Sequence, residues 1–192
     1  MVGVDLSVRD DFSTVTYNIY SVENKSFHSY TDYYFPAGAL EKHPNCELYK
    51  GWVKAGFLHL CKGDIIDYKQ IVNDILRMAK FLCILGIGYD PYKSAEFVNL
   101  LSSSVGGSAD IINPVKQTYG TFTSPVESFE IATYSNKISF DPNPITPYCF
   151  ANAVLDEDRN CNRKPIKKAH NAKIDSTITN LMTFHLFNNY TE

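Results

Sequence analysis

The chain has 192 residues, with 18 Lys and Arg, 21 Asp and Glu, and a formal net charge of −3, which is room for one domain and too little for two full-sized ones. With 44% apolar, 14% aromatic and 20% charged residues, the composition excludes global disorder. The longest apolar stretch, residues 81–88, is far shorter than the ~20 residues of a membrane-spanning helix, so we expect neither a membrane span nor a signal peptide. Five cysteines without a C-x-x-C pair indicate reduced thiols, a reducing cytoplasm and no zinc site.

The charge is segregated along the chain. Residues 159–173 carry six bases and no acid, which leaves 12 bases against 21 acids elsewhere, a balance of −9. A basic strip of this kind can follow the phosphate backbone of a nucleic acid, although a solvated loop is an equally good interpretation. The six bases are Arg159, Arg163, Lys164, Lys167, Lys168 and Lys173.

The first half of the chain alternates strands and helices. Residues 2–7, 14–22 and 27–35 are rich in β-branched and aromatic residues and predict three strands in an antiparallel meander. A short helix over residues 46–55 and a brief edge strand over 57–61 follow. Asp67 begins a capping-box pattern, and the apolar spacing after it predicts a helix over residues 68–82.

The second half continues this alternation. Residues 84–89 predict a buried parallel strand, residues 92–101 a helix, residues 102–108 a loop and residues 110–115 another short strand. Pro125 is expected to open a helix that runs toward Tyr134.

The remaining elements are a helix, a hairpin and a last helix. Residues 143–153 favour the helix, and residues 154–158 and 163–168 predict the arms of a protruding hairpin that carries the basic strip. The last helix begins at Asp175. The resulting order, β-β-β-α-β-α-β-α with one hairpin inserted before the final helix, is a three-layer α/β arrangement with a mixed central sheet.

Three acids stand where this arrangement aims them at one place. Asp5 interrupts the first apolar strand, Asp90 follows the strand over residues 84–89, and Asp175 opens the last helix. If the first and fourth strands are neighbours, Asp5 and Asp90 converge in the crevice at the strand ends, where Asp175 can join them. Each acid also has a structural interpretation: a strand-end turn for Asp5, an Asp-Pro turn for Asp90 and a helix N-cap for Asp175.

Clustered carboxylates repel one another, and their usual role is to hold hard divalent cations. Magnesium or manganese is therefore indicated. Two such ions about 4 Å apart can activate a water and stabilise the leaving oxygen of a phosphodiester, so hydrolysis of a nucleic acid is the chemistry that this cluster favours.

The same segments resemble the nuclease domain of the large terminase subunit of tailed bacteriophages. The matching pieces run in order over nearly the whole chain: residues 2–7 (VGVDLS) with Asp11, 49–56 (YKGWVKAG), 63–68 (GDIIDY), 87–91 (IGYDP), 114–117 (PVKQ), 124–125 (SP), Asn152 and 173–175 (KID). The Tyr-Asp-Pro and Lys-Ile-Asp pieces are the most specific of them.

This resemblance implies a ribonuclease H-like fold and a metal-dependent endodeoxyribonuclease that cuts double-stranded viral DNA during genome packaging in the cytoplasm of the bacterial host. Its metal ligands carry over onto Asp5, which would bridge two ions, and onto Asp90 and Asp175, which would hold one each; Asp11 matches a frequent accessory acid. The implied partners are DNA, the portal protein, the small terminase subunit and a packaging ATPase domain. We expect residues 1–192 to be a single nuclease domain, the C-terminal part of a larger terminase whose N-terminal ATPase is absent here.

Two other functions remain open. The chain could be another ribonuclease H-like nuclease of the resolvase or transposase type, which product analysis would reveal through junction preference or strand transfer. It could also be a nuclease-inert or regulatory module that docks on the portal, and would then fail to bind metal.

Overall fold

One mixed sheet forms the centre of the computed structural model, which describes residues 1–9, 11–92 and 94–191, with the side chains of residues 107–109 and 191 excluded. Its strand order is β4-β3-β2-β1-β5-β6, with β7 pairing on β3, and β8 and β9 form a separate hairpin. The strands are β1 Val2–Asp5, β2 Ser13–Ser21, β3 Ser26–Pro36, β4 His59–Cys61, β5 Ile87–Tyr89, β6 Ile112–Pro114, β7 Ile138–Phe140, β8 Ala153–Glu157 and β9 Arg163–Lys167.

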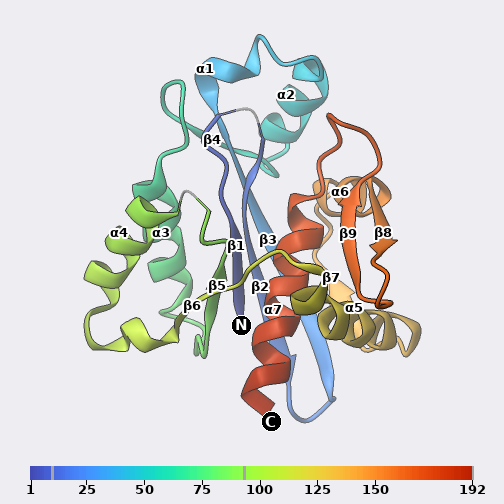
Figure 1. Ribbon diagram of the computed structural model, residues 1–192. Helices are drawn as coiled ribbons and strands as arrows, with labels where there is room; N and C mark the ends of the chain where they lie inside the picture. The colour runs from blue at the N-terminus through green and yellow to red at the C-terminus, as the bar shows by residue number, and fades with distance from the viewer. Residues whose placement is uncertain (10, 93, 192) are drawn as a thin grey trace.

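Helices cover both faces of the sheet (Figure 1). They are α1 Ala37–Leu40, α2 Cys46–Lys54, α3 Tyr68–Met78, α4 Ala95–Val105, the 3-10 helix η1 Gly106–Ile111, α5 Tyr119–Tyr134, α6 Ile145–Ala151 and α7 Asp175–Thr191. Helices α3 and α4 lie on one side of the sheet, and α7 crosses the other side and packs on β1, β2 and β5. The predicted three-layer α/β arrangement with a mixed sheet is confirmed. Among the described residues, no helix is both long and apolar enough to cross a membrane.

The alternation of β1 decides what lies on each face. Val2 and Val4 are buried in the apolar cluster under α3 and α4, so Gly3 and Asp5 point toward α7. A Cβ on Gly3 would lie 2.2 Å from the carbonyl oxygen of Thr179. Only glycine therefore lets the backbone of α7 come this close to the sheet, and this approach brings the first turn of α7 over the end of β1.

The interface between α7 and the sheet is partly polar. Thr179 shares a hydrogen bond of 2.6 Å with Thr16 of β2, and Asn180 accepts one of 2.8 Å from Ser29 of β3. On its other side, α7 buries Ile178, Leu181, Met182 and Leu186 against α5. Because polar contacts and apolar packing hold different sides of α7, the helix is fixed against rotation about its own axis.

Three boundary predictions are wrong. Residues 102–108 are not a loop: α4 continues to Val105, which packs against the same apolar cluster as Phe97 and Leu101. The helix predicted over residues 68–82 ends at Met78. Residue 93, inside the helix predicted over 92–101, lies outside the described residues.

The third correction concerns Pro125. It does not open α5, which begins at Tyr119 after a side-chain cap from Thr118. Phe122 and Val126 are both buried in the cluster beneath α7, so packing continues the helix through the proline. Strand β7 and helix α1 were not predicted.

Candidate metal-dependent nuclease site

Two of the predicted acids meet at the ends of neighbouring parallel strands. Strand β1 pairs with β5 in a register that sets Val4 opposite Tyr89. Asp5 and Asp90 are the next residues of the two strands, so they leave the sheet side by side at its carboxyl edge. Burial of the Asp5 carboxylate, with the charges of Asp90 and Asp11 beside it, raises the pKa of Asp5 to about 7.

The third predicted acid reaches the same place from α7. Asp175 is the first residue of α7 and is only 6% exposed. Burial, and then the charges of Asp11 and Asp5, hold the pKa of Asp175 well above its usual range. Its Oδ2 atom is buried and has no hydrogen-bond partner within the described part of the chain. A buried carboxylate oxygen without a partner is costly and is suited to receive a cation.

Asp11 joins this cluster in a different state, because two lysines hold it. Its Oδ2 lies 2.7 Å from Nζ of Lys167, and its Oδ1 lies 2.8 Å from Nζ of Lys173. The hydroxyl of Ser7 accepts a hydrogen bond of 3.2 Å from the backbone N–H of Asp11 and fixes the loop after β1. To bind a cation, Asp11 would have to exchange one of these lysines for it.

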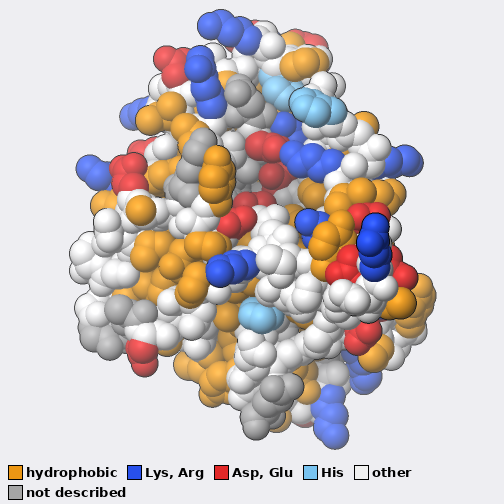
Figure 2. Space-filling model, viewed as in Figure 1, with side chains coloured by type: hydrophobic (Ala, Val, Ile, Leu, Met, Phe, Trp, Pro, Cys, Tyr) orange, Lys and Arg blue, Asp and Glu red, His pale blue; other side chains and the backbone are white. Residues whose placement is uncertain are grey.

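A cavity of about 640 Å³ gives solvent access to these groups, and Asp5, Asp11 and Asp175 line it together with Lys167 and Lys173. In the view of Figure 2, Asp and Glu side chains gather near the centre of the molecule, with Lys or Arg side chains beside them. Asp90 does not line this cavity, although its charge acts on Asp5. One Oδ atom of Asp90 accepts a hydrogen bond of 2.9 Å from the backbone N–H of Tyr92.

The donor set fits a hard divalent cation. All four acids supply oxygen ligands, and Asp175 has an oxygen that nothing else satisfies. Within the described residues, no three His, Cys, Asp or Glu side chains already stand close enough to hold one ion. Mutual repulsion of the carboxylates opposes such an approach until a cation is present, because the cation provides the opposite charge.

The basic strip is less free than its sequence indicates. Arg163 makes a bidentate pair with Glu130 of α5 at 2.9 and 3.2 Å, and Lys167 and Lys173 are paired with Asp11. The ammonium of Lys164 lies 4.4 Å from the centre of the Tyr119 ring. The two remaining members, Arg159 and Lys168, are exposed. The role of the strip in DNA binding stays a prediction.

The sequence interpretation missed the pairing of Lys167 and Lys173 with Asp11. Lys167 and Asp11 are separated by 156 positions, so no local pattern joins them. The one local signal was the resemblance of residues 173–175, in which Lys173 stands two residues before Asp175.

A comparison with known protein families shows which family the chain belongs to. The endonuclease domain of the terminase large subunit matches residues 1–190. The chain belongs to this family. The resemblance to terminase nucleases is thus confirmed.

The relatives of this terminase nuclease domain agree with its fold. Protein YmfN of Escherichia coli strain K12 is 25% identical over 146 residues, which cover 74% of this chain and 31% of YmfN. The large terminase of bacteriophage HK97 is 20% identical and superposes with a TM-score of 0.85. The match covers 96% of this chain and 38% of the HK97 chain. The magnesium-bound large terminase nuclease of thermophilic phage G20c is 6% identical, with 95% and 78% of the two chains covered and a TM-score of 0.59.

These matches confirm the ribonuclease H-like fold of the terminase nucleases. The chain spans about a third of the length of YmfN and of the HK97 protein.

Proposed function

We propose that this terminase nuclease domain is a metal-dependent endonuclease that cleaves double-stranded viral DNA during genome packaging. Asp5, Asp90 and Asp175 would hold two divalent cations, magnesium or manganese. The observation that carries the proposal is the buried Oδ2 of Asp175, which has no hydrogen-bond partner among the described residues, in a residue that lines the same cavity as Asp5. The magnesium in the related G20c nuclease supports the choice of metal.

Bound cations of this kind supply an activated water and stabilise the leaving oxygen of a phosphodiester. The residues of this chain would fix where that happens. Asp5 and Asp90 are anchored at adjacent strand ends, and Asp175 is anchored by the packing of α7 on β1. Such placement on strands and a helix keeps the ligands preorganised.

Asp11 and its two lysines would have a positioning role. Lys167 and Lys173 place two positive charges beside Asp5 and Asp175. These charges partly offset the repulsion among the acids before a cation binds. In this proposal Asp11 orients the lysines, and it becomes an accessory metal ligand only if one lysine leaves.

The whole-protein partners are proposals as well. Double-stranded DNA would be the substrate, and a packaging ATPase domain, the portal protein and the small terminase subunit would be partners in the host cytoplasm. The length of the HK97 terminase supports further domains, because this chain covers 38% of it.

The direct test replaces single carboxylates by amides. Asp90→Asn and Asp175→Asn should each abolish cleavage of plasmid DNA in magnesium or manganese, a loss of at least about 100-fold, because each removes a cation ligand. Circular dichroism should find both variants folded. Asp110→Asn changes an exposed acid on η1 and serves as the matched control, with cleavage unchanged.

Full activity of Asp90→Asn would refute its role. Folded wild-type protein that binds neither metal nor DNA, yet binds the portal, would favour a docking module. A preference for branched junctions, or strand transfer, would favour a resolvase or transposase type of activity.

A further inference from the structure

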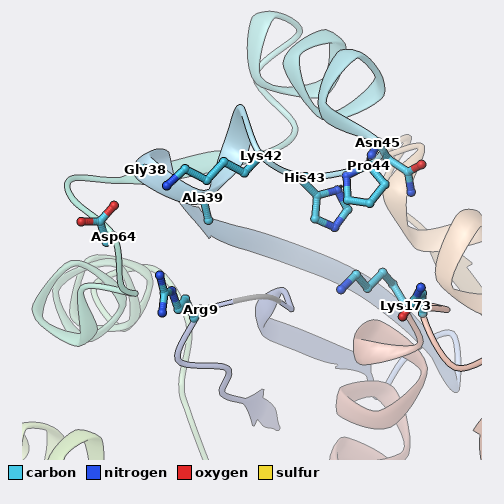
Figure 3. Close-up of a pocket in the computed structure, with 10 residues that line it drawn as sticks. Arg9, Gly38, Ala39, Lys42, His43, Pro44, Asn45, Asp64 and Lys173 are labelled. Carbon is cyan, nitrogen blue, oxygen red and sulfur yellow. Dashed lines mark hydrogen bonds between the residues drawn. The ribbon is translucent and has the colours of Figure 1, made fainter.

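A second cavity, of about 450 Å³, adjoins the cavity that Asp5, Asp11 and Asp175 line. Arg9, Asn171 and Lys173 line both, so the two cavities share one wall. The second cavity lies between the loop after β1 and the segment that joins α1 to α2 (Figure 3). A ligand that occupies the first cavity and is longer than one phosphate can therefore extend into the second.

Lys and Arg outnumber acids three to one among the lining residues of this second cavity, whereas the first cavity is lined by three of each. Arg9 comes from the loop after β1 and Lys42 from the segment after α1, and both side chains are exposed. Neither has an ion pair within the described residues, whose ion pairs involve other side chains. Asp64 is the one carboxylate among the described lining residues. Arg9 and Lys42 are thus two bases without an ion pair among the described residues, at a cavity next to the one that the acid cluster lines.

A fixed histidine forms another part of the wall. The ring of His43 stacks on Tyr49 with centroids 4.4 Å apart and meets the edge of Phe35 at 5.5 Å. Nδ1 of His43 accepts a hydrogen bond of 3.1 Å from the backbone N–H of Asn45. Because Nδ1 is an acceptor, the ring proton lies on Nε2, and the packing sets the direction of that donor.

We propose that this second cavity is a subsite for a DNA backbone phosphate that neighbours the scissile one, with Arg9 and Lys42 as its phosphate contacts. The inference rests on the proposed nuclease function and extends it to residues outside the acid cluster. Arginine and lysine neutralise phosphates, arginine with two parallel N–H donors and lysine as a point charge. A phosphate next to the scissile one would lie outside the acid cluster, where Arg9 and Lys42 supply positive charge.

The test measures binding and catalysis separately. Binding of a fluorescein-labelled DNA duplex is followed in calcium, without cleavage, over a series of salt concentrations from about 50 mM upward. The Arg9→Ala/Lys42→Ala variant should bind about 10-fold more weakly, with a salt slope lower by about 1 to 2. Lys80→Ala/Lys137→Ala removes two charges at the opposite end of the sheet and is the control, with affinity changed less than about 2-fold.

Two further arms locate the effect. Arg9→Lys/Lys42→Arg should restore most of the affinity, because the charges return. Hydrolysis of thymidine 5′-monophosphate p-nitrophenyl ester, which has no neighbouring backbone phosphate, should be unchanged in the single variant Lys42→Ala, because Lys42 lines only the second cavity.

Three results would overturn the subsite. Both alanine pairs could weaken DNA binding equally, Arg9→Ala/Lys42→Ala could leave DNA binding unchanged, or the wild type could bind no DNA. Loss of the small-ester activity in Lys42→Ala would also overturn it, since Lys42 would then act on the scissile phosphate. A failure of the proposed nuclease site can be distinguished from a failure of the subsite. The first appears as intact cleavage by Asp90→Asn, whereas the second appears in the DNA affinities of the Arg9 and Lys42 variants.

Discussion

The acids around the larger cavity differ in how their charges are satisfied. Both oxygens of Asp11 are paired with lysines, whereas Oδ2 of Asp175 is buried with no partner among the described residues. Asp5 lies between these cases, with a pKa raised by burial and by two neighbouring carboxylates. Asp5 and Asp175 therefore gain most from a bound cation, and Asp11 gains least.

This difference predicts a pH-dependent stability. Folded Asp5 keeps its proton up to about pH 7, while the unfolded chain releases it near pH 4, so the folded state binds more protons between these values. The metal-free protein should therefore lose about 2 kcal/mol of unfolding free energy between pH 5 and pH 7 through this group. Urea unfolding at both pH values, without metal, measures the loss.

Asp5→Asn is the control for that experiment. Since the amide does not titrate, its unfolding free energy should fall less than that of the wild type over the same interval. Magnesium should stabilise the wild type more at pH 7 than at pH 5, because protons no longer compete for the carboxylate. A wild type whose stability rises from pH 5 to pH 7 while Asp5→Asn stays flat would contradict the placement of Asp5.

Some residue-scale features could be predicted from the sequence. The positions of Asp5 and Asp90 at strand ends were sufficient to expect them at one edge if the two strands are neighbours, and β1 does pair with β5. The lysines on Asp11 were not predictable, because their pairing depends on how the hairpin and the segment before α7 return to the loop after β1. The cluster could be expected from local patterns, but its counter-charges could not.

At the scale of elements, the site depends on how closely α7 approaches β1. Gly3→Ala would place a methyl group against the carbonyl of Thr179, at 2.2 Å without rearrangement. Helix α7 would have to move away from the sheet, at a cost of about 3 kcal/mol. Thermal unfolding should detect this loss, and cleavage activity should fall with it because Asp175 moves with α7.

Gly51→Ala provides the matched control. Gly51 lies within α2, and a Cβ there would meet nothing within 4 Å. This change should raise the unfolding free energy by about 0.5–1 kcal/mol, since alanine favours a helix over glycine. Wild-type stability in Gly3→Ala would show that α7 does not lie against β1 as described.

Element boundaries could be predicted where a local signal dominates. Asp67 accepts hydrogen bonds from the backbone N–H groups of Lys69 and Gln70, so the capping pattern located the start of α3 correctly. Pro125 gave a misleading signal, because buried neighbours in α5 outweigh its preference for a helix start. Strand β7 has only three residues and depends on pairing with β3, which no local pattern reveals.

At the scale of the whole molecule, the acid cluster lies between two basic regions. The hairpin β8–β9 brings Lys167 to one side of it, and Arg9 and Lys42 face the second cavity on another. Only the first region could be recognised in the sequence, because its six bases all lie within residues 159–173. Three of those six are paired with carboxylates. The second region assembles from residues 33 positions apart in the sequence and becomes visible only in the fold.

We propose that Asp5, Asp90 and Asp175 hold divalent cations at the carboxyl edge of the sheet. Anomalous diffraction from a crystal of this chain soaked in manganese tests it most directly. Two neighbouring manganese peaks should then lie within about 2.0–2.6 Å of carboxylate oxygens of these acids. A saturating soak that gives no manganese peak at Asp5, Asp90 and Asp175 would contradict this proposal.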